Sequence, residues 1–71
     1  MRVSYNRLWK LLIDKKMMKV ELRDKAGISS STLALMGKDR TVGTKVLMKI
    51  CEVLDCNVGD IMDILPDEEK K

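Results

Sequence analysis

Residues 19–38 read KVELRDKAGISSSTLALMGK, which predicts two short helices joined at Gly27. A glycine at this point can adopt the left-handed conformation that ends the first helix at little steric cost. Ser29 can then accept hydrogen bonds from the backbone N–H groups that open the second helix. Apolar side chains recur three or four residues apart, as on two helix faces, at Leu22, Ala26, Leu33 and Met36. Helices joined in this way form a helix-turn-helix, whose second helix enters the major groove of DNA.

The segment before this motif predicts an amphipathic helix from about residue 5 to residue 16. Its apolar side chains follow the i, i+3, i+4, i+7 spacing of one helix face, at Tyr5, Leu8, Trp9 and Leu12. Ser4 is suited to cap the N-terminus of this helix. The two helices of the motif then cover about residues 19–26 and 30–37.

Two more helices are expected after the motif and a polar loop at residues 38–43. Apolar residues at helical spacing predict a helix over about residues 45–54, with Thr44 as its cap. A capping box at residues 57 and 60 predicts a last short helix through Leu65, which the following proline ends. The two side chains of this box are Asn57 and Asp60.

No segment alternates between apolar and polar residues as a strand would, so the sequence predicts an all-α fold of five helices without a sheet. A chain of 71 residues has room for one domain. We expect this domain to cover residues 1–66, followed by an acidic and polar tail at residues 67–71.

The charges of the chain are unevenly distributed. Residues 1–49 hold twelve Lys or Arg and four Asp or Glu, whereas residues 50–71 hold two and seven, within a net charge of +3. A basic body of this kind favours a polyanionic partner such as DNA.

The composition argues against several other functions. The chain has no histidine, and therefore no ready general base near neutral pH and no full set of Cys and His metal ligands. Its two cysteines, Cys51 and Cys56, fit buried thiols in a reducing compartment. No apolar run reaches the ~18 residues that span a membrane. We therefore expect a cytoplasmic protein that is no enzyme and uses no metal, cofactor, membrane or small-molecule substrate.

Three segments in order resemble the phage-repressor-type (Xre/Cro-like) helix-turn-helix regulators of bacteria, in their minimal single-domain form. These segments are SYNRLWKLLIDK at 4–15, ELRDKAGISSSTLALMGK at 21–38 and KVLMKICEVLDCNVGDIMDIL at 45–65. The resemblance implies a compact five-helix bundle of the lambda-repressor-like type. It also implies a transcriptional regulator, such as a repressor, that binds operator DNA as a homodimer.

The chain departs from the pattern of this family at two places. Arg23 stands where a small residue is usual, so its long side chain is expected to extend outward past the packed helices. The exposed side of the second motif helix lacks the usual Arg, Lys, Gln or Asn, and has Ser30, Ser31, Ala34 and Leu35 instead. We therefore expect modest direct readout of bases, with DNA shape contributing more of the selection.

The motif and the resemblance together select candidate DNA contacts. Groove contacts are expected from Ser30, Ser31, Thr32 and Leu35, because hydroxyls bond to several base edges and a leucine can meet a thymine methyl. Phosphate contacts are expected from Lys19, Ser29, Lys38, Arg40 and Lys45. Four cationic contacts imply a slope of log K against log salt of roughly −3 to −4.

Alternatives remain open on the sequence alone. The weakly polar groove face also fits a protein-interaction module, antirepressor-like or antitoxin-like, that keeps the fold with weak DNA affinity. Two further alternatives are that Leu35 packs on a neighbouring helix or on a partner protein, and that the three consecutive serines form only a turn and a cap. A dimer surface is expected on the last helix, from exposed apolar residues near Ile61, Met62 and Ile64.

Overall fold

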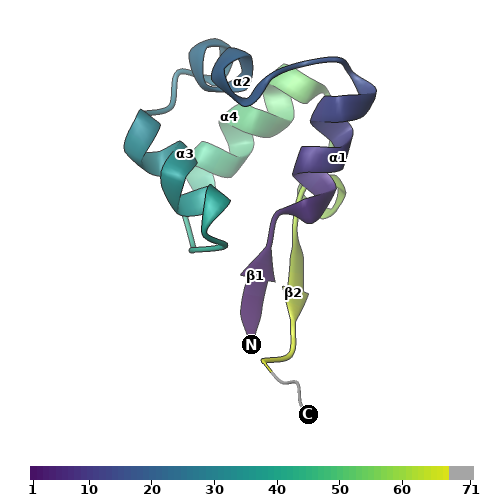
Figure 1. The fold of residues 1–71 in the computed structure, drawn as a ribbon, viewed down its shortest axis with the longest axis vertical. Helices are drawn as coiled ribbons and strands as arrows, with labels where there is room; N and C mark the ends of the chain where they lie inside the picture. The colour runs from purple at the N-terminus through teal and green to yellow at the C-terminus, as the bar shows by residue number, and fades with distance from the viewer. Residues whose placement is uncertain (68–71) are drawn as a thin grey trace.

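The structure, a computed structural model, describes residues 1–67. Its elements are, in chain order, β1 (Arg2–Ser4), α1 (Asn6–Asp14), α2 (Lys19–Ala26), α3 (Ser30–Gly37), α4 (Thr44–Leu54), the 3₁₀ helix η1 (Val58–Asp60) and β2 (Asp63–Leu65). In the view of Figure 1, α4 runs between α1 on one side and α3 on the other, and α2 lies across the top. The two strands project from this helical body as a ribbon.

The core forms where α2 packs on α4 and where α1 and η1 close the remaining side. Full burial of one aliphatic side chain contributes roughly 1.5–3 kcal/mol. The buried apolar side chains come from the four α-helices, from Tyr5 just before α1 and from Ile61 just after η1. Those on the helices are Leu8, Leu12, Leu22, Ala26, Met36, Ile50 and Leu54. The core therefore fixes α3 relative to α2 and α4, and leaves the outer side of α3 in solvent.

The helix-turn-helix has the bounds that the sequence predicts. Both α2 and α3 begin and end at the expected residues. Gly27 has φ 68°, in the left-handed region, and its N–H bonds to the carbonyl of Arg23. Ser29 is the N-cap of α3, where its hydroxyl accepts from the N–H of Thr32. The local capping prediction is thus confirmed at both sides of the turn.

The prediction of five helices without a sheet was wrong at the chain ends. β1 and β2 pair antiparallel, with Val3 opposite Ile64. The Asn57–Asp60 capping box does form, since the Asp60 carboxylate accepts from the N–H of Asn57 at 3.0 Å, but it opens only the single turn of η1. Beyond this turn the backbone extends into β2, because pairing with β1 satisfies its polar groups.

Two helix caps also differ from the prediction. Tyr5, not Ser4, is the N-cap of α1, and Gly43, not Thr44, is the N-cap of α4. α1 ends at Asp14, two residues early, because Lys16 turns into the left-handed region with φ 56°. Of the expected tail, Asp67 is described, and its carboxylate pairs with the Met1 ammonium at 2.7 Å. Residues 68–71 lie outside the described residues.

Candidate nucleic-acid interface

The N-terminus of α3 is exposed and well capped. The Ser29 hydroxyl accepts from the N–H of Thr32 at 3.1 Å and lies 2.9 Å from the Thr32 hydroxyl. Ser30 and Ser31 are exposed, whereas Thr32 is half-buried. Free N–H groups in the first turn, together with the helix dipole, attract an anion such as a phosphate.

Arg23 adds a cation to this helix end, a role that the sequence did not predict. Its guanidinium donates to the Ser30 hydroxyl at 3.0 Å and to the Asp24 carboxylate at 3.1 Å. The Arg23 side chain, which was expected to extend outward past the packed helices, therefore reaches the first residue of α3. The contact between Arg23 and Ser30 depends on how α2 packs against α3. The sequence indicates it only through a basic residue seven positions before Ser30.

The outer face of α3 carries hydroxyl and apolar groups. Ser30, Ser31 and Ala34 are exposed, and Leu35 is 44% exposed. Leu35 is thus available to a groove or to a partner protein, since the core is formed instead by Met36, which is fully buried. The face offers small donors and acceptors but no long side chain for a bidentate base contact.

Lys19 lies in the first turn of α2. Its ammonium is 4.3 Å from the centre of the Trp9 ring, a cation–π contact worth about 0.5–1 kcal/mol at an exposed site. A cation at a helix N-terminus is disfavoured by the helix dipole. The indole ring offsets part of this cost, and a bound anion would offset more.

The remaining expected phosphate contacts lie on one loop and the helix that follows it. Lys38 and Arg40 are exposed directly after α3, and Lys45 is exposed in the first turn of α4. Within residues 1–67, none of these three side chains forms an ion pair. The structure therefore leaves three cationic groups available on the loop after α3 and in the first turn of α4. Figure 1 shows where this loop joins the two helices.

We predict that Ser29→Ala lowers the thermal stability of the protein, because the hydroxyl is the only side-chain cap of α3 in the described chain. Loss of such a cap costs about 0.5–2 kcal/mol. A thermal melt followed by circular dichroism measures this change, with Ser31→Ala as the matched control because the Ser31 side chain is exposed and caps no helix. Equal melting temperatures for the two variants would contradict the capping role.

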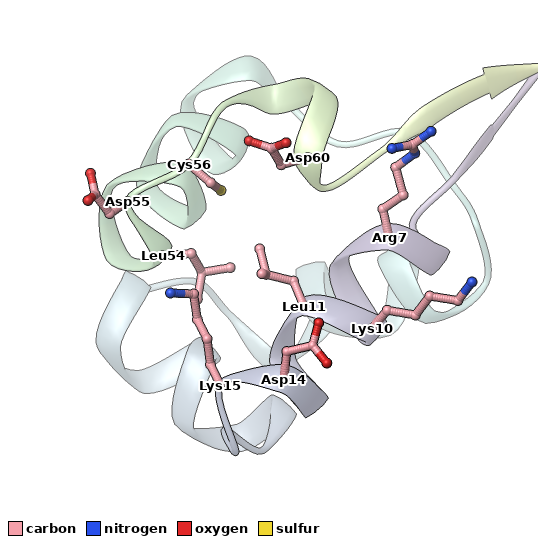
Figure 2. Close-up of a pocket in the computed structure, with 9 residues that line it drawn as sticks. All are labelled: Arg7, Lys10, Leu11, Asp14, Lys15, Leu54, Asp55, Cys56 and Asp60. Atoms are coloured by element: carbon pink, nitrogen blue, oxygen red, sulfur yellow. The ribbon is translucent and has the colours of Figure 1, made fainter.

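A groove of about 360 Å³ lies between α1 and the end of α4, as Figure 2 shows. Its walls carry three cations and three carboxylates, so it has no net charge to attract a polyanion. The lining residues are Arg7, Lys10, Leu11, Asp14, Lys15, Leu54, Asp55, Cys56 and Asp60. This groove is separate from the surface of α3.

The Cys56 thiol in this groove is a weaker acid than an ordinary cysteine thiol. Burial, then the neighbouring Cys51 and the Asp60 carboxylate, raise the pKa of the Cys56 thiol from 9.0 to about 11. The nearby Lys15 ammonium acts in the opposite direction. Only the thiolate is nucleophilic, so the native thiol reacts slowly near neutral pH.

We predict that iodoacetamide alkylates native Cys56 much more slowly than the denatured chain at pH 9, and that the native rate rises up to about pH 11. Because the pKa of Cys56 is raised in the folded state, the protonated thiol stabilises the fold below pH 9. This stabilisation is lost as the pH rises through about 11. Mass spectrometry of timed samples measures the alkylation of each cysteine. Equal native and denatured rates at pH 9 would contradict the raised pKa.

A second groove, of about 350 Å³, is lined mainly by apolar side chains of α1, the turn after it and the start of α2. Ile13 and Met18 on its walls are 74% and 68% exposed, and Trp9 lies between the groove and the core. Exposed apolar groups of this kind are typical of surfaces that contact other proteins.

Two kinds of feature are absent from residues 1–67. No helix there has the length and apolar character needed to cross a membrane. The same residues hold no group of three or more His, Cys, Asp or Glu side chains that is placed to bind a metal ion.

Comparison with known proteins agrees with this geometry. Residues 7–67 match the Cro/C1-type HTH DNA-binding domain. The chain is 33% identical over 61 residues to YozG of Bacillus subtilis (strain 168), an uncharacterized HTH-type transcriptional regulator, covering 83% of this chain and 73% of YozG. The crystal structure of the transcriptional regulator VanUg (Form II) superimposes with a TM-score of 0.91 at 56% identity, over 93% of this chain and 88% of VanUg.

These likenesses, together with the helix-turn-helix formed by α2 and α3, support a DNA-binding transcriptional regulator. Domains of this family are generally not enzymes. The chain belongs to the Cro/C1-type helix-turn-helix family of DNA-binding domains.

Proposed function

We propose that the protein is a sequence-specific regulator that inserts α3 into the major groove of operator DNA, as a homodimer. The observation that carries this proposal is the exposed N-terminus of α3. It combines the N-cap Ser29, free first-turn N–H groups and the Arg23 guanidinium. Such a helix end binds a phosphate and orients the following side chains toward the bases.

The proposed readers of the groove are Ser30, Ser31 and Leu35. The serine hydroxyls bond to several base edges, and Leu35 contacts a thymine methyl. Thr32 contributes less than the sequence suggests, because its hydroxyl already lies 2.9 Å from the Ser29 hydroxyl. Recognition of this kind depends strongly on the shape and deformability of the DNA.

The proposed phosphate contacts surround this helix. Lys19 and Ser29 act at the N-termini of α2 and α3, and Lys38, Arg40 and Lys45 act after α3. The four cations of each protomer predict a salt slope of roughly −3 to −4 per half-site. Two protomers on a two-fold operator place their α3 helices about 34 Å apart, one turn of DNA.

The proposed dimer surface has fewer exposed apolar residues than the sequence predicts. Ile61 is fully buried in the core, so the prediction that it belongs to an exposed dimer surface was wrong. Met62 is half-buried, and Ile64 is 56% exposed on β2, opposite Val3. We therefore propose that a dimer contact includes the Ile64 face of the ribbon.

The test is a fluorescence-anisotropy titration of the protein against DNA from its own upstream region and against a scrambled duplex, from ~50 to ~200 mM salt. The proposal predicts preference for the upstream DNA, a steep salt slope and two protomers per duplex in sedimentation. Weak and equal binding to both duplexes would contradict it.

A second candidate function is a protein-interaction module with weak DNA affinity. The observation that favours it is the apolar groove beside Trp9, where Ile13 and Met18 are largely exposed. Equal binding to the two duplexes in the titration above would support this module, and mutation of the groove would then be the next step.

A further inference from the structure

We infer that Tyr5 is a positioning residue for the phosphate contact of Arg40, an inference that rests on the function proposed above. Tyr5 joins β1 to α1, and its side chain is 1% exposed. Its hydroxyl donates to the carbonyl oxygen of Arg40 at 2.8 Å, and its backbone N–H donates to the Asp39 carboxylate at 3.3 Å. One buried residue thus holds two consecutive residues of the loop that follows α3.

The loop between α3 and α4 has an uncommon backbone that benefits from this support. Asp39 has φ 56°, a left-handed conformation that aspartate tolerates better than most residues. The N–H of Arg40 bonds back to the carbonyl of Leu35 at 2.9 Å. With the Tyr5 contact, the N–H and the carbonyl of Arg40 are both fixed, so less backbone freedom is lost when Arg40 binds a phosphate.

The backbone N–H of Tyr5 also fixes the carboxylate of Asp39, the one acidic residue of the loop at residues 38–43. Asp39 stands between Lys38 and Arg40, and a carboxylate there repels DNA phosphates. Its hydrogen bond to the N–H of Tyr5 holds the carboxylate at the N-terminus of α1, where the helix dipole favours negative charge. Lys38 and Arg40 remain exposed.

The Tyr5 hydroxyl keeps its proton throughout the neutral range. Burial, followed by the charge of Asp39, raises the pKa of Tyr5 above 10.0, whereas a backbone hydrogen bond at Val42 lowers it. The phenol therefore remains a donor to the Arg40 carbonyl. From the sequence, Tyr5 belongs only to the apolar face of the first helix, because both partners lie more than thirty residues away in the chain.

The test is Tyr5→Phe, which removes the hydroxyl and keeps the ring. We expect the affinity for upstream DNA at 0.1 M salt to fall by about threefold to tenfold, with a shallower salt slope, because one phosphate contact is weakened. In an Arg40→Gln background the same change is expected to alter the affinity by less than about twofold, because the residue that Tyr5 positions is already gone. Circular dichroism monitors the fold of each variant.

Ile61→Val serves as the control for a loss of core stability alone, because Ile61 is fully buried directly after η1 and no hydrogen bond joins its side chain to the loop. It is expected to lower the melting temperature and to leave DNA affinity and salt slope unchanged. Unchanged affinity in Tyr5→Phe, an equal loss in the Arg40→Gln background, or an equal loss in Ile61→Val would overturn this inference alone. Absence of DNA binding by the parent protein would overturn the proposed function as well.

Discussion

Reversal of charge at Lys38 and Lys45 is expected to abolish tight binding to operator DNA. Both side chains are exposed, one directly after α3 and one in the first turn of α4. Each phosphate contact contributes about tenfold in affinity at 0.1 M salt, so the loss of two predicts at least about a 100-fold weaker complex. The salt slope of the variant is expected to be shallower by about 1.8 per half-site.

The matched control is the pair Lys10→Glu and Lys15→Glu, which changes the net charge by the same amount. Both lysines line the groove of Figure 2 beside α1, on the side of α4 away from α3 in Figure 1. At 0.1 M salt, charges more than about 10 Å from the DNA are largely screened, so we expect a change of less than about threefold. Anisotropy titrations of both variants against the same duplex provide the comparison. Retained affinity in a folded Lys38→Glu, Lys45→Glu protein would contradict the phosphate contacts proposed for these two lysines.

Leu22→Ala is expected to cause the largest loss of stability. Leu22 is fully buried on α2, the helix that packs on α4. Truncation of a buried leucine costs about 2–5 kcal/mol, because apolar contact is lost and a cavity remains. Domains have about 0.05–0.15 kcal/mol of stability per residue, or roughly 4–11 kcal/mol for a chain of this length. The variant therefore keeps only a small margin, and its melting temperature is expected to fall by at least about 10 °C.

Val20→Ala is the control for this change, because it lies on the same helix and its side chain is 47% exposed. Chemical denaturation and thermal melts are expected to show a small effect for Val20→Ala, within about 0.5 kcal/mol for an exposed site. Similar losses in the two variants would mean that α2 does not pack on α4 through Leu22.

The sequence was sufficient to predict α2 and α3 because their ends depend on local chemistry. Gly27 ends α2 through its left-handed conformation, and Ser29 opens α3 through its hydroxyl. The ribbon was not predictable in the same way. Each strand has three residues, too few to show alternation, and the pairing of Val3 with Ile64 joins opposite ends of the chain. Ile61, Ile64 and Leu65 also fit a helix face at i, i+3 and i+4.

In the candidate interface, too, the residues selected by local sequence were predictable and the contacts between distant elements were not. The ten-residue region from Ser29 to Lys38 could be assigned from the motif, and its roles in DNA binding stay predictions. The contacts of Arg23 with Ser30 and of Tyr5 with Arg40 depend on packing between elements. Residue type alone assigns Tyr5 to the core and Arg23 to the solvent, so only the folded arrangement identifies either as part of the interface.

The most direct test of insertion of α3 into DNA is an NMR titration of ¹⁵N-labelled protein with the upstream duplex. We predict that the largest amide shift changes occur in α3, at the start of α2 and in residues 38–45, and that they saturate at one protomer per half-site. Residues of the Figure 2 groove are expected to change little. Changes centred on that groove or on Ile13, with α3 unaffected, would contradict the insertion of α3 into DNA.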